Sequence, residues 1–344
     1  MVRFVLPFIL LLAGMYPASA QMAFDAKPPR HSVALWGNAW DIYAKGIIDQ
    51  GTAARLEALI LRLNLPDKSQ VHFDSEGGNL LAALELGRVI RKYGLHTYVG
   101  DWKRKDLVPC FSACTLAYLG GRFRFYSDNA MYGMHRFYFT GGASAATTSD
   151  VAQVASAEVV AYMREMGVDP NLFTEMTMAG RHELNILPKE RLEELHAVNN
   201  GVGPSVWTLE GVENGIYLKG VRDSVYGASK FIVMCDSNSK QIAIFAGFDP
   251  VGRTEEILKM GAQSLLVDGK SIPLKTEKPV VNDGWINVLY ELDDHHVAAL
   301  VGAETVGVAF QFFPEAPLFL GFDRMHFLDA RPKLSGLMSV CGVK

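Results

Sequence analysis

A serine between two cysteines is the first candidate for chemistry in this 344-residue chain, in the run Cys110-Phe-Ser112-Ala113-Cys114. An apolar stretch follows it, so the sequence predicts that Ser112 lies at the first turn of a short helix over residues 112–119. At that position its hydroxyl can attack a carbonyl carbon, while the next backbone N–H, that of Ala113, can hold the developing oxyanion. The alternative is that Ser112 only caps the helix, as serines often do.

A histidine that could serve as the base follows in the chain. His135 ends a predicted short strand over residues 130–134, just before a glycine-rich loop. An imidazole with a pKa near ~6.5 can take the proton of a serine hydroxyl at neutral pH. The alternative is a structural histidine without a catalytic role.

Two glycines, Gly77 and Gly78, could supply further oxyanion donors. They stand between a predicted strand over residues 71–73 and a predicted amphipathic helix over residues 80–93. Backbone N–H groups at the start of a helix are unpaired and lie at the positive end of its dipole, where negative charge is stabilised. The alternative is a tight turn that needs glycine only for its backbone angles.

These residues belong to a region in which strands and helices alternate up to about residue 200, which indicates an α/β fold with parallel strands. Beyond residue 207 the pattern changes to strands with turn signals, including Asp268-Gly269 as a hairpin. We therefore expect an α/β domain over residues 21–205 and a smaller, mixed and mostly β domain over residues 206–344. The other predicted helices are 52–63, 147–166, 170–178, 188–196, 293–301 and 333–341. The other predicted strands are 31–37, 95–99, 124–126, 231–234, 241–246, 264–267, 271–274, 286–291 and 306–312, and residues 100–109 are predicted as a loop.

The order of these motifs resembles the Clp protease proteolytic subunit and its wider ClpP/crotonase superfamily, in particular exported ClpP-like proteins with a Ser-Ala-Cys core. Ser75-Glu-Gly-Gly78 stands where the protease has Ser-Pro-Gly-Gly, Ser112 stands at its nucleophile and His135 at its base. The resemblance covers roughly residues 31 to 200. It implies a layered ClpP/crotonase-like fold, amide or ester hydrolysis and a homo-oligomer, and we expect no cofactor.

Two departures from that family bear on the mechanism. Glu76 replaces the proline and brings a carboxylate near the expected oxyanion site. The protease orients its histidine with an aspartate, but residues 173–185 contain none; Glu183 and Glu175 are available, and we prefer Glu183 as the third catalytic residue. A Ser/His pair oriented by a backbone or amide group is the alternative.

The first twenty residues read as a secretory signal peptide. A basic start, an apolar run over residues 4–14 and a small-residue site ending at Ala20 predict cleavage after Ala20. We therefore expect a periplasmic or secreted protein without a stable membrane anchor after cleavage. An uncleaved N-terminal anchor is the alternative.

Export changes how the cysteines are interpreted, because an oxidising compartment favours disulfides. We expect a Cys235–Cys341 disulfide, since one residue lies in an apolar strand and the other near the chain end. Cys110 and Cys114 could be a second disulfide, free thiols, or ligands with His135. No zinc-binding pattern is present, so we expect no metal.

Composition excludes some classes of function. The chain has 33 Lys and Arg against 37 Asp and Glu, a net charge of -4 that argues against nucleic-acid binding. We therefore predict an exported serine hydrolase, a ClpP-like peptidase acting on a peptide or on a small ester or amide substrate. The alternatives are a catalytically inactive binding or scaffold protein of this fold, and an acyl-thioester enzyme, which would need an acyl-CoA-like ligand.

Overall fold

The computed structural model describes most of the chain, as two compact units that divide between Val198 and Asn199. The predicted signal peptide and the predicted strand over residues 31–37 lie outside the described residues. The predicted domain boundary lay seven residues later, after residue 205. The structure describes residues 21–29, 38–101, 103–138, 145–180, 182–212, 215–236, 239–314, 316–327 and 330–342.

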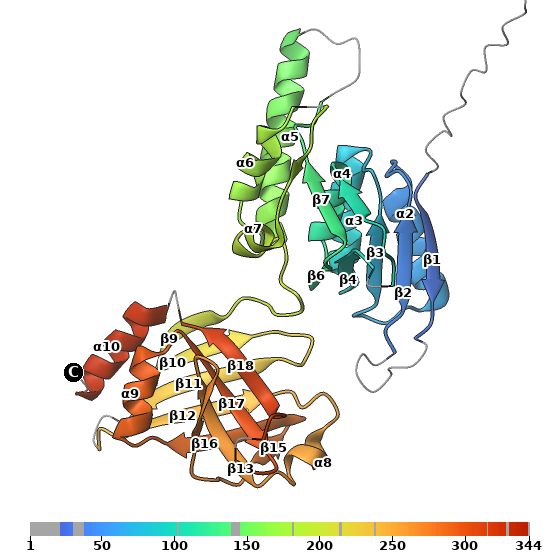
Figure 1. Cartoon of the computed structure of the whole chain (residues 1–344). Helices are drawn as coiled ribbons and strands as arrows, with labels where there is room; N and C mark the ends of the chain where they lie inside the picture. Colours follow the sequence, from blue (N-terminus) through green and yellow to red (C-terminus); the bar gives the residue numbers. More distant parts are fainter. Residues whose placement is uncertain are drawn as a thin grey trace, which may run out of the picture. The chain divides into compact units, whose positions relative to one another are not determined.

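Two sheets form the first unit (Figure 1). The larger has the strand order β1-β2-β3-β4-β6, in which β2, β3, β4 and β6 run parallel and β1 is antiparallel. The smaller has the order β5-β7-β8, with β5 and β7 parallel. The α/β prediction with parallel strands is thus confirmed for this unit. The strands are β1 (Ala23–Lys27), β2 (Asp41–Lys45), β3 (Gln70–Asp74), β4 (His96–Val99), β5 (Val108–Phe111), β6 (Arg124–Tyr126), β7 (Ala130–Met134) and β8 (Asn185–Ile186).

The helices of this unit follow the apolar spacing of the sequence. Helix α2 buries Leu56, Leu59 and Ile60 on one face, and α3 is capped by Asn79, whose side chain accepts a hydrogen bond from the Ala82 N–H. Both helices contribute to the hydrophobic core of the unit. The helices are α2 (Thr52–Leu63), α3 (Leu80–Lys92), α4 (Ala113–Leu119), α5 (Ala145–Glu165), α6 (Asn171–Met178) and α7 (Lys189–Glu194).

Residues 108–111 correct the end of the loop that was predicted over residues 100–109. They form β5, in which Val108 and Cys110 are buried and alternate with partly exposed residues. The strand pairs in parallel with β7, so its last residue, Phe111, lies opposite Gly133. A four-residue strand that contains a proline has too little pattern to be recognised from sequence, because its pairing partner stabilises it.

The C-terminal end of α4 is held by two arginines. Arg91 and Arg124 both donate to the carbonyl oxygens of Leu119 and Gly121, and Arg124 also donates to Ala197 and His196. Carbonyls at helix ends carry partial negative charge, which guanidinium groups stabilise. Burial lowers the pKa of Arg124 to about 10, which leaves it protonated. The short helix that follows Ser112 is therefore anchored at its far end.

The second unit consists of antiparallel sheets with the strand orders β15-β16-β12-β11-β10-β9 and β14-β13-β17-β18. Its core includes Phe231, Tyr290 and Phe310. A disulfide joins Cys235 of β11 to Cys341 of α10, the pairing expected from the sequence. The strands are β9 (Val206–Val212), β10 (Gly215–Arg222), β11 (Ser229–Cys235), β12 (Ile242–Phe248), β13 (Ala262–Val267), β14 (Lys270–Pro273), β15 (Val280–Asn282), β16 (Trp285–Glu291), β17 (Thr305–Gln311) and β18 (Leu320–His326). The helices are α8 (Thr254–Ile257), α9 (Asp294–Gly302) and α10 (Arg331–Cys341).

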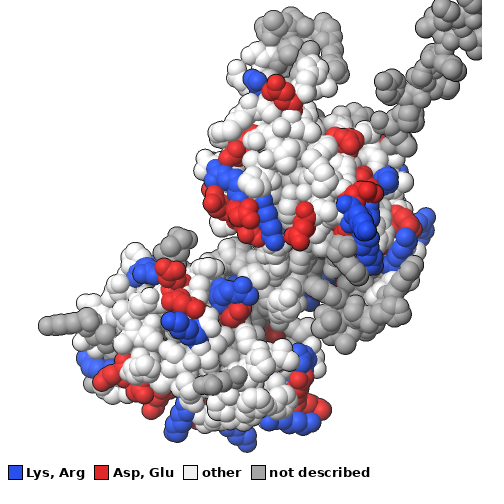
Figure 2. Space-filling model, in the orientation of Figure 1, with Lys and Arg blue, Asp and Glu red and all other residues white. Residues whose placement is uncertain are grey.

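Charges of both signs are interspersed on the visible surface of each unit (Figure 2). This distribution agrees with the small net charge of -4. None of the helices in the described part of the chain combines the length and the hydrophobicity that crossing a bilayer requires.

Candidate functional site

Ser112 lies at the turn between β5 and α4. Its backbone has φ 51° and ψ -124°, a conformation that residues with a side chain rarely adopt. Its N–H donates to the Gly133 carbonyl oxygen of β7 at 2.8 Å. Its side chain does not cap α4, and within the described chain its half-buried hydroxyl makes no hydrogen bond. The hydroxyl is therefore available for chemistry, and helix capping does not explain this serine.

The Gly77–Gly78 turn packs directly against Ser112. A Cβ placed on Gly77 would lie 2.8 Å from the Ser112 Cβ and 3.0 Å from the Ala113 nitrogen. Gly77 also has φ 104°, so both the close approach and the backbone angle require glycine. The tertiary structure thus brings together two motifs that lie 35 residues apart in the chain.

The three expected oxyanion donors differ in availability. The Gly77 N–H donates to the Ser75 Oγ at 3.1 Å, and Ser75 in turn donates to the Gly46 carbonyl oxygen at 2.6 Å. The N–H groups of Gly78 and Ala113 have no acceptor among the residues that the structure describes. Two of the three donors can therefore receive a ligand, whereas Gly77 contributes by letting the backbones approach.

Glu76 is the departure that placed a carboxylate near these donors. Glu76 is exposed, whereas its neighbours Ser75 and Gly77 are buried. An exposed carboxylate is screened by water, so its repulsion of a developing oxyanion is weakened.

His135 follows the last residue of β7, the strand that accepts the Ser112 N–H at Gly133. Its Nδ1 lies 2.8 Å from the Arg136 carbonyl oxygen. A carbonyl only accepts hydrogen bonds, so Nδ1 carries a proton, and in the neutral imidazole Nε2 then has the free lone pair that a base needs. The structure places Ser112 and His135 at the same end of neighbouring strands, without a hydrogen bond between their side chains.

The carboxylates proposed to orient His135 lie in different settings. Glu183 is exposed, and its carboxylate approaches Gly180, as does the Arg136 guanidinium. Glu175 forms an ion pair with Arg191 at 2.9 Å, which commits it to holding α6 and α7 together. Neither carboxylate bonds to His135 in the described chain; the group on Nδ1 is a backbone carbonyl.

Asn185 is a polar residue near this site that the sequence interpretation did not single out. It pairs with Met134, the residue just before His135, through the antiparallel β7–β8 ladder. Its side-chain nitrogen donates to the Glu175 carbonyl oxygen at 3.0 Å. Asn185 is the last residue of the stretch 173–185, which was considered above for the third catalytic residue. Its position in that stretch and its amide group were the sequence signals that could have identified it.

A disulfide joins Cys110 and Cys114, one of the alternatives left open for these cysteines. Both residues are fully buried, Cys110 in β5 and Cys114 in α4. Ser112 therefore lies within the short segment of chain that this disulfide closes into a ring. In the described ranges, no group of three or more His, Cys, Asp or Glu residues is arranged to hold a metal ion.

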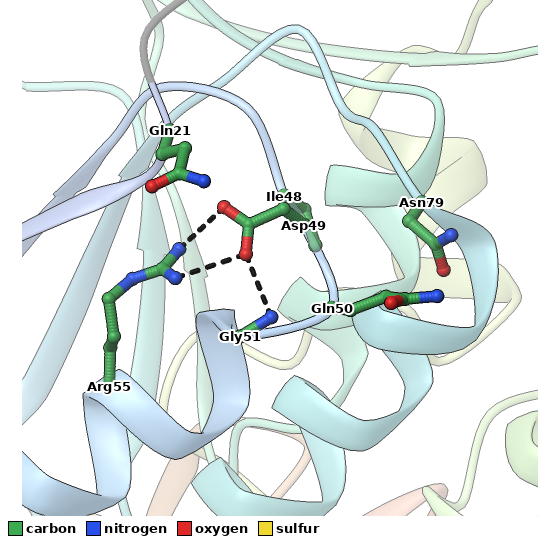
Figure 3. Close-up of a pocket in the computed structure, with 7 residues that line it drawn as sticks. All are labelled: Gln21, Ile48, Asp49, Gln50, Gly51, Arg55 and Asn79. Carbon is green, nitrogen blue, oxygen red and sulfur yellow. Dashed lines mark hydrogen bonds and ion pairs between the residues drawn. The ribbon is translucent and has the colours of Figure 1, made fainter.

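A surface hollow of about 570 Å³ lies next to the Gly-Gly turn, because Asn79, the residue after Gly78, lines it (Figure 3). Asp49 and Arg55 face each other in it through two hydrogen bonds of 2.7 and 3.0 Å, which hold the pKa of Asp49 below its usual value. Neither Ser112 nor His135 lines the hollow. Its lining residues are Gln21, Ile48, Asp49, Gln50, Gly51, Arg55 and Asn79.

Comparison with known proteins places few constraints on this site. No protein-family model matches the chain, and no curated protein matches it. Among solved structures, a mutant of ClpP1 from Listeria monocytogenes matches with 16% sequence identity and a TM-score of 0.34. That match covers 44% of this chain and 85% of the ClpP1 chain.

Proposed function

We propose that this protein is an exported serine hydrolase that cleaves amide or ester bonds, with a peptide as the preferred class of substrate. The observation that supports the proposal most strongly is the backbone of Ser112. A strained residue with a free hydroxyl between a strand and a helix is the arrangement that exposes a nucleophilic serine in hydrolases.

In this mechanism the Ser112 hydroxyl attacks the substrate carbonyl while its proton passes to Nε2 of His135. The N–H groups of Gly78 and Ala113 bind the oxyanion of the tetrahedral intermediate. His135 then returns the proton to the leaving amine or alcohol, which leaves an acyl group on Ser112. Water, deprotonated by the same imidazole, releases the acyl group.

His135 has to approach Ser112 for the first step. The Gly133 carbonyl already binds the Ser112 N–H, and in this proposal a local change in the two residues after Gly133 brings the imidazole to the hydroxyl. Catalytic hydrogen bonds are often long or absent in unliganded enzymes and form when substrate binds. The Arg136 carbonyl, rather than Glu183, is the group that keeps the reactive tautomer in this proposal.

A fluorophosphonate probe tests the proposal, because it reacts preferentially with activated serines. The full chain is purified from a host that exports it, and intact mass reports both removal of residues 1–20 and the probe adduct. We expect one adduct on the wild type, none on Ser112→Ala, and at least ~100-fold slower labelling of His135→Gln. Ser156→Ala is the control, because the Ser156 hydroxyl is tied to the Ala152 carbonyl within α5 and should not change the labelling.

Among the described residues no carboxylate bonds to His135, which favours a second function, a binding or scaffold protein that keeps this fold without turnover. That function predicts a folded wild type that does not react with the probe. Equal labelling of wild type and Ser112→Ala would instead show that another residue is the nucleophile. Self-association of the chain stays a prediction, which sedimentation of the same preparation measures.

A further inference from the structure

The Cys110–Cys114 disulfide closes a small ring around Ser112. Cys110 is the third residue of the four in β5, and Cys114 is the second residue of α4. Their Cα atoms lie 5.2 Å apart. Only three residues stand between the two cysteines, and Ser112 is the middle one.

The backbone angles of Ser112 need such support. Holding a residue with a side chain in a sparsely populated backbone region costs free energy, and such angles persist only where the surroundings enforce them. One constraint is the hydrogen bond from the Ser112 N–H to Gly133, and a second is the contact with Gly77. The disulfide is the constraint that ties the strand before Ser112 to the helix after it.

Release of this bond would let the turn relax. Without it, φ of Ser112 can return to the negative values that residues with a side chain prefer, and such a change redirects both the Ser112 side chain and the Ala113 N–H. The hydroxyl and one oxyanion donor depend on the same backbone angles. The disulfide therefore controls two parts of the site at once.

We propose that the Cys110–Cys114 disulfide is a positioning element that holds Ser112 in its reactive conformation, so that the hydrolase becomes active only after oxidation. This inference rests on the function proposed above. In the reducing compartment where the chain is made, the two thiols stay free and the serine stays unreactive. Export then switches the enzyme on where its substrates are.

The oxidation is a thiol–disulfide exchange with a disulfide-carrying oxidant. The thiolate of one cysteine attacks the oxidant and forms a mixed disulfide, while one sulfur of the oxidant leaves as a thiolate. The second cysteine then loses its proton, and its thiolate attacks the sulfur of the first cysteine in the mixed disulfide. The Cys110–Cys114 bond forms, the oxidant departs as a dithiol that has gained two electrons, and the two thiol protons are taken up by it.

A matched pair of variants tests the inference in the full chain. The double variant Cys110→Ala/Cys114→Ala removes the bond beside Ser112, and Cys235→Ala/Cys341→Ala removes the bond in the other unit. We expect at least ~10-fold slower fluorophosphonate labelling for the first and unchanged labelling for the second. With an ester substrate, kcat should fall in the first variant while KM stays the same, because the bond orients reacting groups rather than binding substrate.

Reduction and reoxidation provide a test that involves no core substitution. In the Cys235→Ala/Cys341→Ala protein, dithiothreitol should open the remaining disulfide, as counted by thiol alkylation, and labelling should fall in proportion. Reoxidation with oxidised glutathione should restore it. A protein with both thiols alkylated, an unchanged circular dichroism spectrum and an unchanged labelling rate would overturn the inference.

Hydrogen exchange separates this inference from the proposed function. Peptides that cover residues 108–116 should exchange at least ~10-fold faster in Cys110→Ala/Cys114→Ala if the bond holds the Ser112 backbone. If the wild type never labels but exchange accelerates, the hydrolase proposal fails and the positioning of Ser112 stands. If neither exchange nor labelling changes in the folded variant, the disulfide does not position Ser112.

Discussion

The packing of α3 against Tyr162 of α5 depends on Gly87, and replacement of Gly87 by alanine should destabilise the first unit. A Cβ on Gly87 would lie 1.8 Å from the Tyr162 hydroxyl oxygen and 2.9 Å from its Cζ. Tyr162 is fully buried and donates to the Leu116 carbonyl oxygen of α4 at 2.8 Å, so the ring cannot move aside without losing that bond. Alanine at position 87 would therefore push α3 away from Tyr162 of α5 or break the hydrogen bond that ties Tyr162 to α4.

The magnitude follows from three contributions. Alanine is intrinsically better than glycine inside a helix by about 1 kcal/mol, which opposes the destabilisation. Overpacking costs about 1–3 kcal/mol, and weakening the Tyr162 hydrogen bond costs about 1 kcal/mol more. We expect Gly87→Ala to lower the free energy of unfolding by about 1–3 kcal/mol. Gly336→Ala is the control, since this α10 glycine has open space around its Cβ position and should gain up to about 1 kcal/mol.

A double-mutant cycle identifies the hydroxyl as the cause. Tyr162→Phe alone should cost about 1 kcal/mol through the lost bond to Leu116. Combined with Gly87→Ala it removes the atom that clashes, so the double variant should be at least about 1 kcal/mol more stable than the sum of the single effects. The assay is urea unfolding read by pulsed hydrogen exchange of peptides from α3 and α4, because the two units need not unfold together. A Gly87→Ala protein as stable as the wild type, or a coupling near zero, would refute the reasoning.

Three further predictions concern stability. Burial lowers the pKa of His96 to about 4 in the folded protein. In the unfolded chain this histidine binds a proton near pH ~6.5, so its contribution to stability is complete above that pH. The free energy of unfolding falls by about 3 kcal/mol as the pH drops toward 4. Thermal melts across this range should show the loss in the wild type and a smaller loss in His96→Phe. The Cys235–Cys341 bond joins residues with a sequence separation of 106, so its removal should lower the free energy of unfolding of the second unit by about 2–5 kcal/mol. Denaturant unfolding of the second unit measures this loss, and an unchanged midpoint would contradict it. Asn79→Ala removes the cap on α3 and should cost about 1 kcal/mol, whereas Asn79→Ser should retain most of it.

Several elements could be predicted because their signals are local. The spacing of Leu56, Leu59 and Ile60 predicted a helix over residues 52–63, and α2 has those bounds. Asp268 and Gly269 predicted a hairpin, and they connect β13 to β14 with φ 50° and 77°, the positive values that a tight hairpin turn requires. Helical periodicity and turn chemistry act over a few residues, so one sequence is enough to reveal them.

Other elements have no local signal. Strand β5 is four residues long and contains a proline, and β1 lies at the edge of its sheet. Each is stabilised by pairing with a strand that lies elsewhere in the chain, β7 for the first and β2 for the second. Sequence patterns hold little information about such pairing, because it depends on which backbones the fold brings together.

The residue types at the candidate site were determined by the sequence alone: a serine before an apolar helix, a glycine pair before another, and a histidine after a strand. Their relation was decided by the tertiary structure. The packing of Gly77 against Ser112, the parallel pairing of β5 with β7 and the Cys110–Cys114 bond surround Ser112, whose φ is positive, and the N–H groups of Gly78 and Ala113 have no acceptor among the described residues. The physical reason is that backbone angles against local preference persist only under long-range contacts, which no short stretch of sequence contains.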